Sequence, residues 1–111
     1  FIVANDKSIS ASADVAMPND TRVVITNSSN PDAYPISTFT RIIAYKEQSY
    51  NNRTATQAKA LVDLLKYVIG KDGQEIAVKT HYAALPQSAQ EKTTAIINSM
   101  TFDGKAISDI Q

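Results

Sequence analysis

Residues 54–70 read TATQAKALVDLLKYVIG and contain the clearest periodic pattern in the chain. Apolar side chains recur there at steps of three and four residues, namely at Ala58, Leu61, Val62, Leu65, Val68 and Ile69. Because this spacing gathers them on one face of a helix, we predict an amphipathic helix over residues 56–69. Gly70 follows at the place where a left-handed C-terminal cap is common, so we expect the helix to end there.

The residues that follow predict two further helices. The pattern restarts after Gly73 and predicts a shorter helix that ends near His81. Ser88 and Glu91 have the spacing of a capping box, in which side chains satisfy backbone N–H groups at a helix start. They open a last predicted helix that runs to Met100, and beyond residue 101 we expect a tail.

Upstream of the long helix, the composition is typical of strands. Residues 22–26 and 38–46 are rich in β-branched and aromatic side chains and predict two strands. Turn-forming residues separate them, and a short helix is predicted over residues 6–14. We expect the apolar face of the long helix to pack on residues 41–45. This order predicts an α/β fold with few strands and about four helices, although two strands make too little sheet to stand alone.

Composition and charge limit the classes of function. The chain has 111 residues, with 11 basic and 11 acidic side chains and a formal net charge of zero. This size allows one small core, and the charge balance argues against a nucleic-acid partner or a polybasic membrane patch. With no Cys and a single His, the sequence offers neither a cysteine-based zinc site nor a multi-histidine site. We therefore expect no metal and no cofactor.

Two catalytic or ligand-binding alternatives rest on single features. His81 is the only imidazole, and no G-x-S-x-G motif surrounds any Ser, so a hydrolase that uses His81 is a distant hypothesis and we expect no catalytic residue. Gly70-Lys71-Asp72-Gly73 lacks the spacing of a phosphate-binding loop and lies between predicted helices. We interpret it as a helix boundary.

Three short motifs carry information about the protein family. They are Tyr34-Pro35-Ile36 before the second strand, Gly73-Gln74 after the long helix, and Tyr82-Ala83-Ala84-Leu85-Pro86 before the last helix. In this order and at this spacing they resemble the C-terminal part of the periplasmic phosphate-binding proteins, the substrate-binding components of bacterial phosphate ABC importers. The resemblance extends from Phe1 to about Met100.

The resemblance implies a fold and a division of the chain. The family has a type II periplasmic binding protein-like fold, in which two α/β lobes close over the anion. By resemblance, residues 1–33 correspond to the end of lobe two, residues 34–36 to a crossover between lobes, and residues 37–111 to the C-terminal part of lobe one. The candidate site residues are accordingly the crossover residues Tyr34, Pro35 and Ile36.

The resemblance also implies a function. It predicts a noncatalytic, periplasmic or cell-surface protein that captures inorganic phosphate and delivers it to an ABC transporter permease. The family's Ser-Gly-Thr ligand motif does not occur here, and Arg22, Arg41 and Arg53 do not match a ligand motif, so no ligand-binding residue is assigned. Since family members are longer and the chain begins at Phe1 rather than Met, we expect a C-terminal fragment whose phosphate ligands lie upstream.

Two expectations follow for the 111-residue chain. If a sheet is missing, exposed strand edges favour a homo-oligomer, because an unpaired edge is a template for another strand. The alternative function is an independent small binding or adhesion module that reuses this lobe without anion binding.

Overall fold

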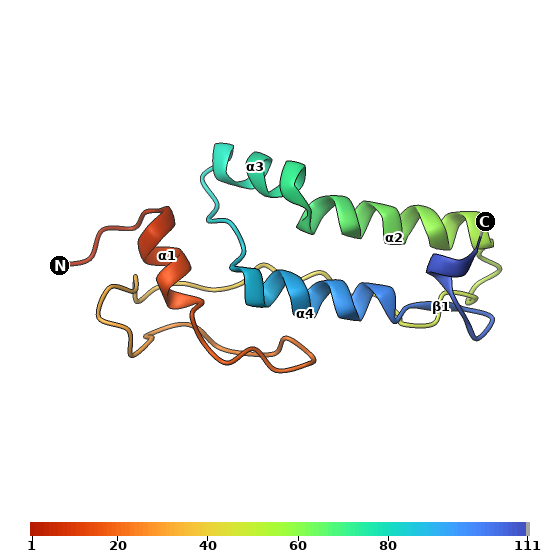
Figure 1. The fold of residues 1–111 in the computed structure, drawn as a ribbon, viewed down its shortest axis with the longest axis horizontal. Helices are drawn as coiled ribbons and strands as arrows, with labels where there is room; N and C mark the ends of the chain where they lie inside the picture. Colours follow the sequence, from red (N-terminus) through yellow and green to blue (C-terminus); the bar gives the residue numbers. More distant parts are fainter. Residues whose placement is uncertain (111) are drawn as a thin grey trace.

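The computed structural model describes residues 1–110. Within this range the chain is a mostly helical small domain, with four α-helices and one two-stranded antiparallel hairpin. The domain is elongated, 52 × 27 × 21 Å, with the termini at opposite ends (Figure 1). The elements are α1 (Asp6–Ser12), α2 (Ala55–Ile69), α3 (Lys71–Lys79), α4 (Gln87–Asn98), β1 (Thr101–Phe102), β2 (Lys105–Ala106) and a terminal 3₁₀ helix η1 (Ile107–Asp109).

The long predicted helix is confirmed as α2. Its start is a capping box, because the Thr54 side chain accepts from the Gln57 backbone N–H while the Gln57 side chain accepts from the Thr54 N–H. Its end differs from the prediction. Gly70 has φ −76° and ψ 174°, an extended rather than a left-handed conformation, because the same residue also starts α3.

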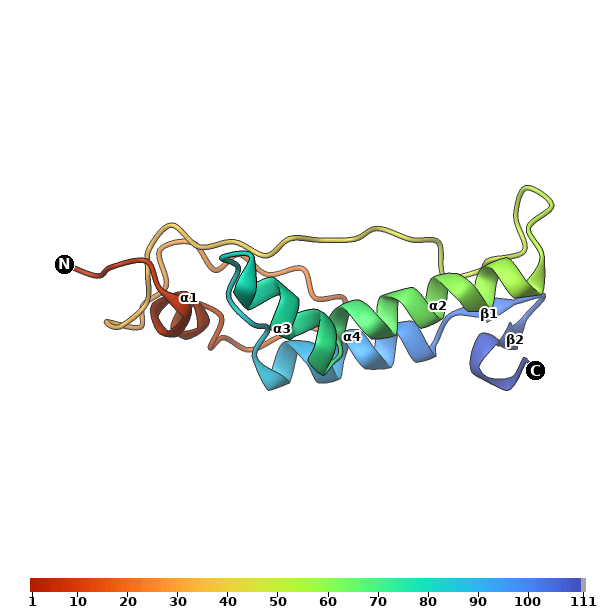
Figure 2. The ribbon, with the colours of Figure 1, turned by 90° about the horizontal axis from the view of Figure 1, so that it is seen from above.

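Helices α2 and α4 lie side by side along the molecule, as Figures 1 and 2 both show. The buried core lies between them and the C-terminal hairpin. It consists of Ala58, Val62, Leu65, Ile97, Met100 and Ile107. The apolar face predicted for the long helix is therefore the face that enters the core.

Two predictions about the last helix and the C-terminus are wrong. Helix α4 begins after Pro86 with no side-chain cap, so the capping box expected at Ser88 is not formed. The expected tail is instead the hairpin followed by η1. Asp103 and Gly104 both have positive φ, at 48° and 74°, as a tight hairpin turn requires, and Ile107 of η1 is fully buried in the core.

The two predicted strands are not formed. Residues 22–26 and 38–46 belong to no ladder, although residues 38–46 run nearly straight along the helices (Figure 2). A strand needs a partner to complete its hydrogen bonds, and the rest of the described chain supplies only an isolated parallel bridge of Glu47 with Thr101, at the end of the second segment. Residues 41–45 and Leu65 line the same open cavity, and Ile42, Ile43 and Tyr45 are exposed. The prediction that the apolar face of α2 packs on residues 41–45 is therefore wrong.

Candidate functional site

The crossover residues lie where the α1 region joins the helical body. The Tyr34 backbone N–H donates to the Ser8 carbonyl at 2.8 Å, and the Asn27 N–H donates to the Pro35 carbonyl at 2.7 Å. Ile36 is exposed, and the Tyr34–Pro35 peptide bond is trans, since residues 1–110 contain no cis peptide. The crossover is thus held through its backbone rather than through a side-chain pocket.

A buried serine cluster fixes this crossover. The Ser12 hydroxyl lies 2.8 Å from the Tyr34 carbonyl and 3.0 Å from the Ser37 hydroxyl, which itself donates to the Tyr34 carbonyl at 2.8 Å. Ser12 and Ser37 are both buried. Sequence reasoning missed them, because residues 25 positions apart share no local motif. Their hydroxyls already bond within the protein, which makes the cluster structural.

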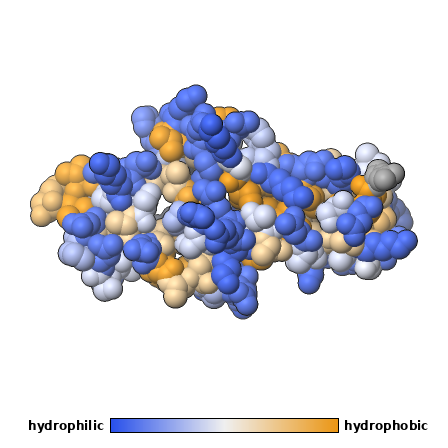
Figure 3. Space-filling model, in the orientation of Figure 1, coloured by the Kyte–Doolittle hydropathy of each residue, from blue (hydrophilic) through white to orange (hydrophobic). Residues whose placement is uncertain are grey.

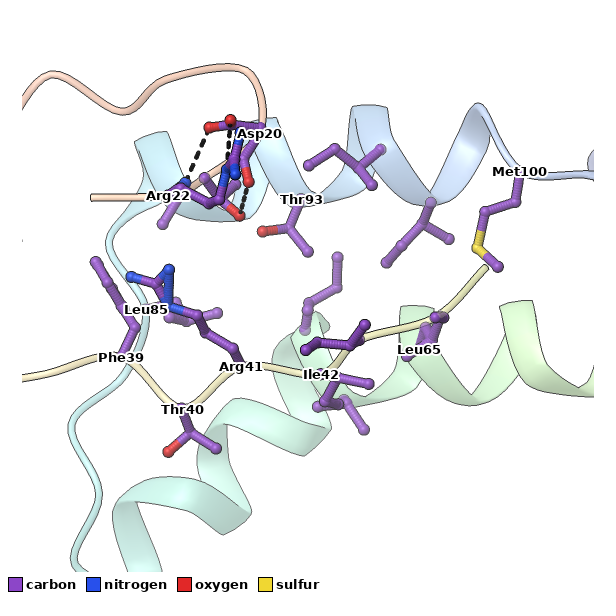
Figure 4. A pocket seen from close by; sticks show the side chains of 18 of the residues that line it. Asp20, Arg22, Phe39, Thr40, Arg41, Ile42, Leu65, Leu85, Thr93 and Met100 are labelled. Atoms are coloured by element: carbon purple, nitrogen blue, oxygen red, sulfur yellow. Dashed lines mark hydrogen bonds and ion pairs between the residues drawn. The ribbon is translucent and has the colours of Figure 1, made fainter. Parts of the chain in front are cut away.

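A cavity of about 600 Å³ lies between residues 39–46 and the helices α2 and α4. Figure 4 shows Phe39 and Ile42 on the extended segment, with Leu65 on α2 and Met100 after α4 also lining the space. Most of the residues that line the cavity are apolar. The cavity therefore suits apolar side chains rather than a free anion.

Charged groups occur at one end of the cavity. The Arg22 guanidinium pairs with Asp20 at 2.8 Å, and the Arg22 backbone N–H donates to the other Asp20 oxygen at 3.0 Å, both drawn in Figure 4. The backbone N–H and then the guanidinium of Arg22 lower the pKa of Asp20. The Arg41 guanidinium donates to the Val23 carbonyl at 2.6 Å. The Asp20 carboxylate beside Arg22 disfavours a free anion at this end of the cavity.

Two of the motifs meet in the structure. The Gln74 side chain accepts from the Leu85 N–H at 2.7 Å and donates to the Val68 carbonyl at 2.9 Å. The Gln90 side chain donates to the Leu85 carbonyl at 2.8 Å. The Gly-Gln and Leu-Pro motifs therefore form one structural joint. It connects the end of α2, the start of α3 and the start of α4.

Gly73 is needed at this joint for space. A Cβ at this position would lie 2.4 Å from the Tyr67 carbonyl oxygen and 2.6 Å from that of Val68, far inside van der Waals contact. The close approach of α3 to the end of α2 is possible because glycine has no Cβ. Gly70 is the helix boundary, as predicted, but α3 already begins at Lys71, so the predicted restart after Gly73 is wrong and Gly73 lies in the first turn of α3.

Glu47 ties the C-terminal hairpin to the segment before α2. Its carboxylate accepts from the Thr101 hydroxyl at 2.6 Å and from the backbone N–H groups of Ser49 and Asp103, each at 3.0 Å. Hydrogen bonds from Thr101 foremost, then from Ser49 and from the Gly104 backbone N–H, lower the pKa of Glu47 to about 2. Sequence reasoning missed this residue, because its partners are 54 and 56 positions away.

His81 is exposed at the end of α3 with φ 67°. Among residues 1–110, no hydrogen bond joins its imidazole to a carboxylate or a serine hydroxyl, so the arrangement lends the hydrolase hypothesis no support. Over the same range no three His, Cys, Asp or Glu side chains gather as metal ligands, and no helix is long and apolar enough to cross a membrane.

Comparison of the chain with protein-family models, with curated proteins and with solved structures finds no match.

Proposed function

We propose that this chain is the C-terminal part of an extracytoplasmic phosphate-binding protein that serves an ABC-type phosphate importer. The observation that carries the proposal is the order and spacing of the three motifs, two of which bond to each other through Gln74 and Leu85. Through this bond the two motifs form one structural unit. The chain itself is noncatalytic in this proposal.

The unpaired strand-like segments support the finer fold, a portion of a type II periplasmic binding protein-like lobe. Residues 22–26 and 38–46 have the composition of buried strands but no partner strands among residues 1–110. An apolar cavity lies beneath the second segment. Both features are expected of a chain whose sheet is completed by other strands.

The character of the cavity bears on where phosphate binds. Dry phosphate sites bring several hydroxyl, backbone N–H and guanidinium donors to one point, whereas this cavity is lined mainly by apolar residues and Asp20 pairs with Arg22. In the proposal, the phosphate ligands are therefore upstream, and phosphate and the permease are partners of the full-length protein.

Isothermal titration of inorganic phosphate tests this proposal. The 111-residue chain is compared with the longer polypeptide that its gene encodes in frame, with sulfate as the control anion. We expect saturable binding of phosphate by the longer polypeptide and no heat with the 111-residue chain. Absence of binding by the longer polypeptide, or saturable binding by the 111-residue chain, would overturn the proposal.

One observation favours a second candidate, a small binding or adhesion module without anion binding. The cavity is lined mainly by apolar residues, and Arg22 and Arg41 each bond to another group of the protein. Both features are expected of a binding module that takes no anion. A coding sequence in which a signal peptide directly precedes Phe1 would favour this module over the phosphate-binding protein.

A further inference from the structure

The segment 38–46 has a backbone with almost no hydrogen-bond partners. Within residues 1–110, none of its N–H groups donates to a protein acceptor, and the carbonyls of residues 38–44 accept from no protein donor. Its side chains are also uncovered: Ile42, Ile43 and Tyr45 are 62%, 97% and 70% exposed. An extended, apolar and unpaired segment is the standard template for strand addition.

A neighbouring segment has the same character. Residues 22–26 run close to the first segment, because the Arg41 guanidinium donates to the Val23 carbonyl at 2.6 Å and the Thr26 hydroxyl donates to the Ser37 carbonyl at 3.0 Å. Val24 is 80% exposed. Each copy of the chain therefore carries two adjacent strand-like segments, with α2 and α4 on the far side of the cavity.

We propose that the 111-residue chain forms a two-fold symmetric dimer in which residues 40–46 of two copies pair as antiparallel strands centred on Ile43. This proposal does not depend on the phosphate-binding function. A partner of this segment must supply a strand backbone, because only another strand completes its row of alternating N–H and carbonyl groups. A second copy supplies such a backbone together with the same apolar side chains.

The charges along the segment agree with this self-pairing. Centred on Ile43, the register places Arg41 opposite Tyr45 and Lys46 opposite Thr40, so no two like charges face each other. The formal net charge of the chain is zero, so the copies do not repel each other at long range. Apolar patches lie among polar groups on the molecular surface (Figure 3).

The layers of the proposed dimer favour its stability. A lone two-stranded ribbon is marginal in water, whereas several strands backed by helices are stable. Pairing of the two copies would bring together both strand-like segments of each copy, with α2 and α4 of each copy across the cavity. In this register Ile43 lies beside Ile43 of the second copy and Ile42 lies beside Ala44, so the pairing covers part of these apolar side chains.

Light scattering coupled to size exclusion tests the proposal on the full 111-residue chain over a range of concentrations. We expect the mass of a dimer that dissociates on dilution. Ile43→Lys places two like charges at the symmetry axis and should weaken the dimer at least several-fold, while the matched variant Ile36→Lys, at an exposed isoleucine outside the paired residues, should not. Circular dichroism checks that both variants keep their helices.

Oxidative cross-linking reports the register directly, because the chain contains no cysteine of its own. Ile43→Cys should form an intermolecular disulfide far faster than Lys59→Cys on the exposed side of α2. A monomer at every concentration, a dimer insensitive to Ile43→Lys, or equal cross-linking of the two cysteine variants would each overturn the proposal.

Discussion

The side-chain oxygen of Gln74 accepts a hydrogen bond of 2.7 Å from the backbone N–H of Leu85. The amide nitrogen of the same side chain donates to the Val68 carbonyl at 2.9 Å. One glutamine at the start of α3 therefore joins the end of α2 to the turn before α4. Gln74 itself lies 11 positions from Leu85 and six from Val68 along the chain.

Replacing Gln74 with Ala removes both bonds and leaves a partly buried N–H and a partly buried carbonyl without partners. We expect a loss of about 1 to 3 kcal/mol in the free energy of unfolding, the range for such unsatisfied groups. Urea denaturation followed by helix circular dichroism measures it. The control is Gln87→Ala, whose exposed side chain bonds only to Glu91; equal losses for the two variants would contradict the role of the joint.

Gly73→Ala should destabilise the protein even though Ala is the better helix former. The added Cβ would lie 2.4 Å from the Tyr67 carbonyl oxygen, and such overpacking costs roughly 1 to 3 kcal/mol, which exceeds the gain of about 1 kcal/mol in helix propensity. Thermal denaturation against Glu75→Ala, an exposed position of the same helix, checks this. A more stable Gly73→Ala variant would mean that α3 does not approach α2 so closely.

Leu65→Ala should remove a central contact of the core. Leu65 is 9% exposed and packs with Val62, Ile97 and Met100, so we expect a cost of about 2 to 5 kcal/mol. Its neighbour Leu64 is 56% exposed, and Leu64→Ala should cost less than about 0.5 kcal/mol. Equal losses of stability for the two variants in denaturant titrations would mean that the face of α2 assigned to the core is wrong.

Glu47 makes stability depend on pH. Its folded-state pKa of about 2 lies below the ordinary value of 4.5, so the carboxylate stabilises the fold fully above pH 4.5 and loses this effect as the pH falls towards 2. Glu47→Gln should be less stable than the parent near neutral pH, and the difference should shrink over this acidic window. Urea denaturation at several pH values measures both, with Glu75→Gln as the surface control. A difference independent of pH would contradict the hydrogen-bonded carboxylate.

Ser12→Ala tests the anchoring of the crossover. The variant removes a buried hydroxyl that lies within hydrogen-bond distance of the Tyr34 carbonyl and the Ser37 hydroxyl. We expect the free energy of unfolding to fall by about 1 to 3 kcal/mol. Ser29→Ala, at an exposed loop position, is the matched control and should have almost no effect. Amide hydrogen exchange at Tyr34 should rise only in Ser12→Ala, and unchanged exchange would show that the other bonds hold the crossover alone.

The helices could be predicted because their signals are local. The three- and four-residue spacing of Leu61, Val62 and Leu65 predicts α2 within one residue at its start, and the bounds of α1, α3 and α4 are close to those expected. The β-type runs are equally visible in the sequence. Their pairing is not, because a strand forms only when a partner supplies the other half of its hydrogen bonds.

Sequence by itself determined which segments are helical and which face of α2 is apolar, since both follow from the spacing of side chains a few residues apart. Tertiary structure alone decided the joint of Gln74 with Leu85, the anchoring of Tyr34 by Ser12 and Ser37, and the bonds of Glu47 to the hairpin. Each of these joins residues whose separation along the chain carries no periodic signal. The physical reason is that hydrogen bonds depend on distance in space, and only the packed fold brings such residues within 3 Å.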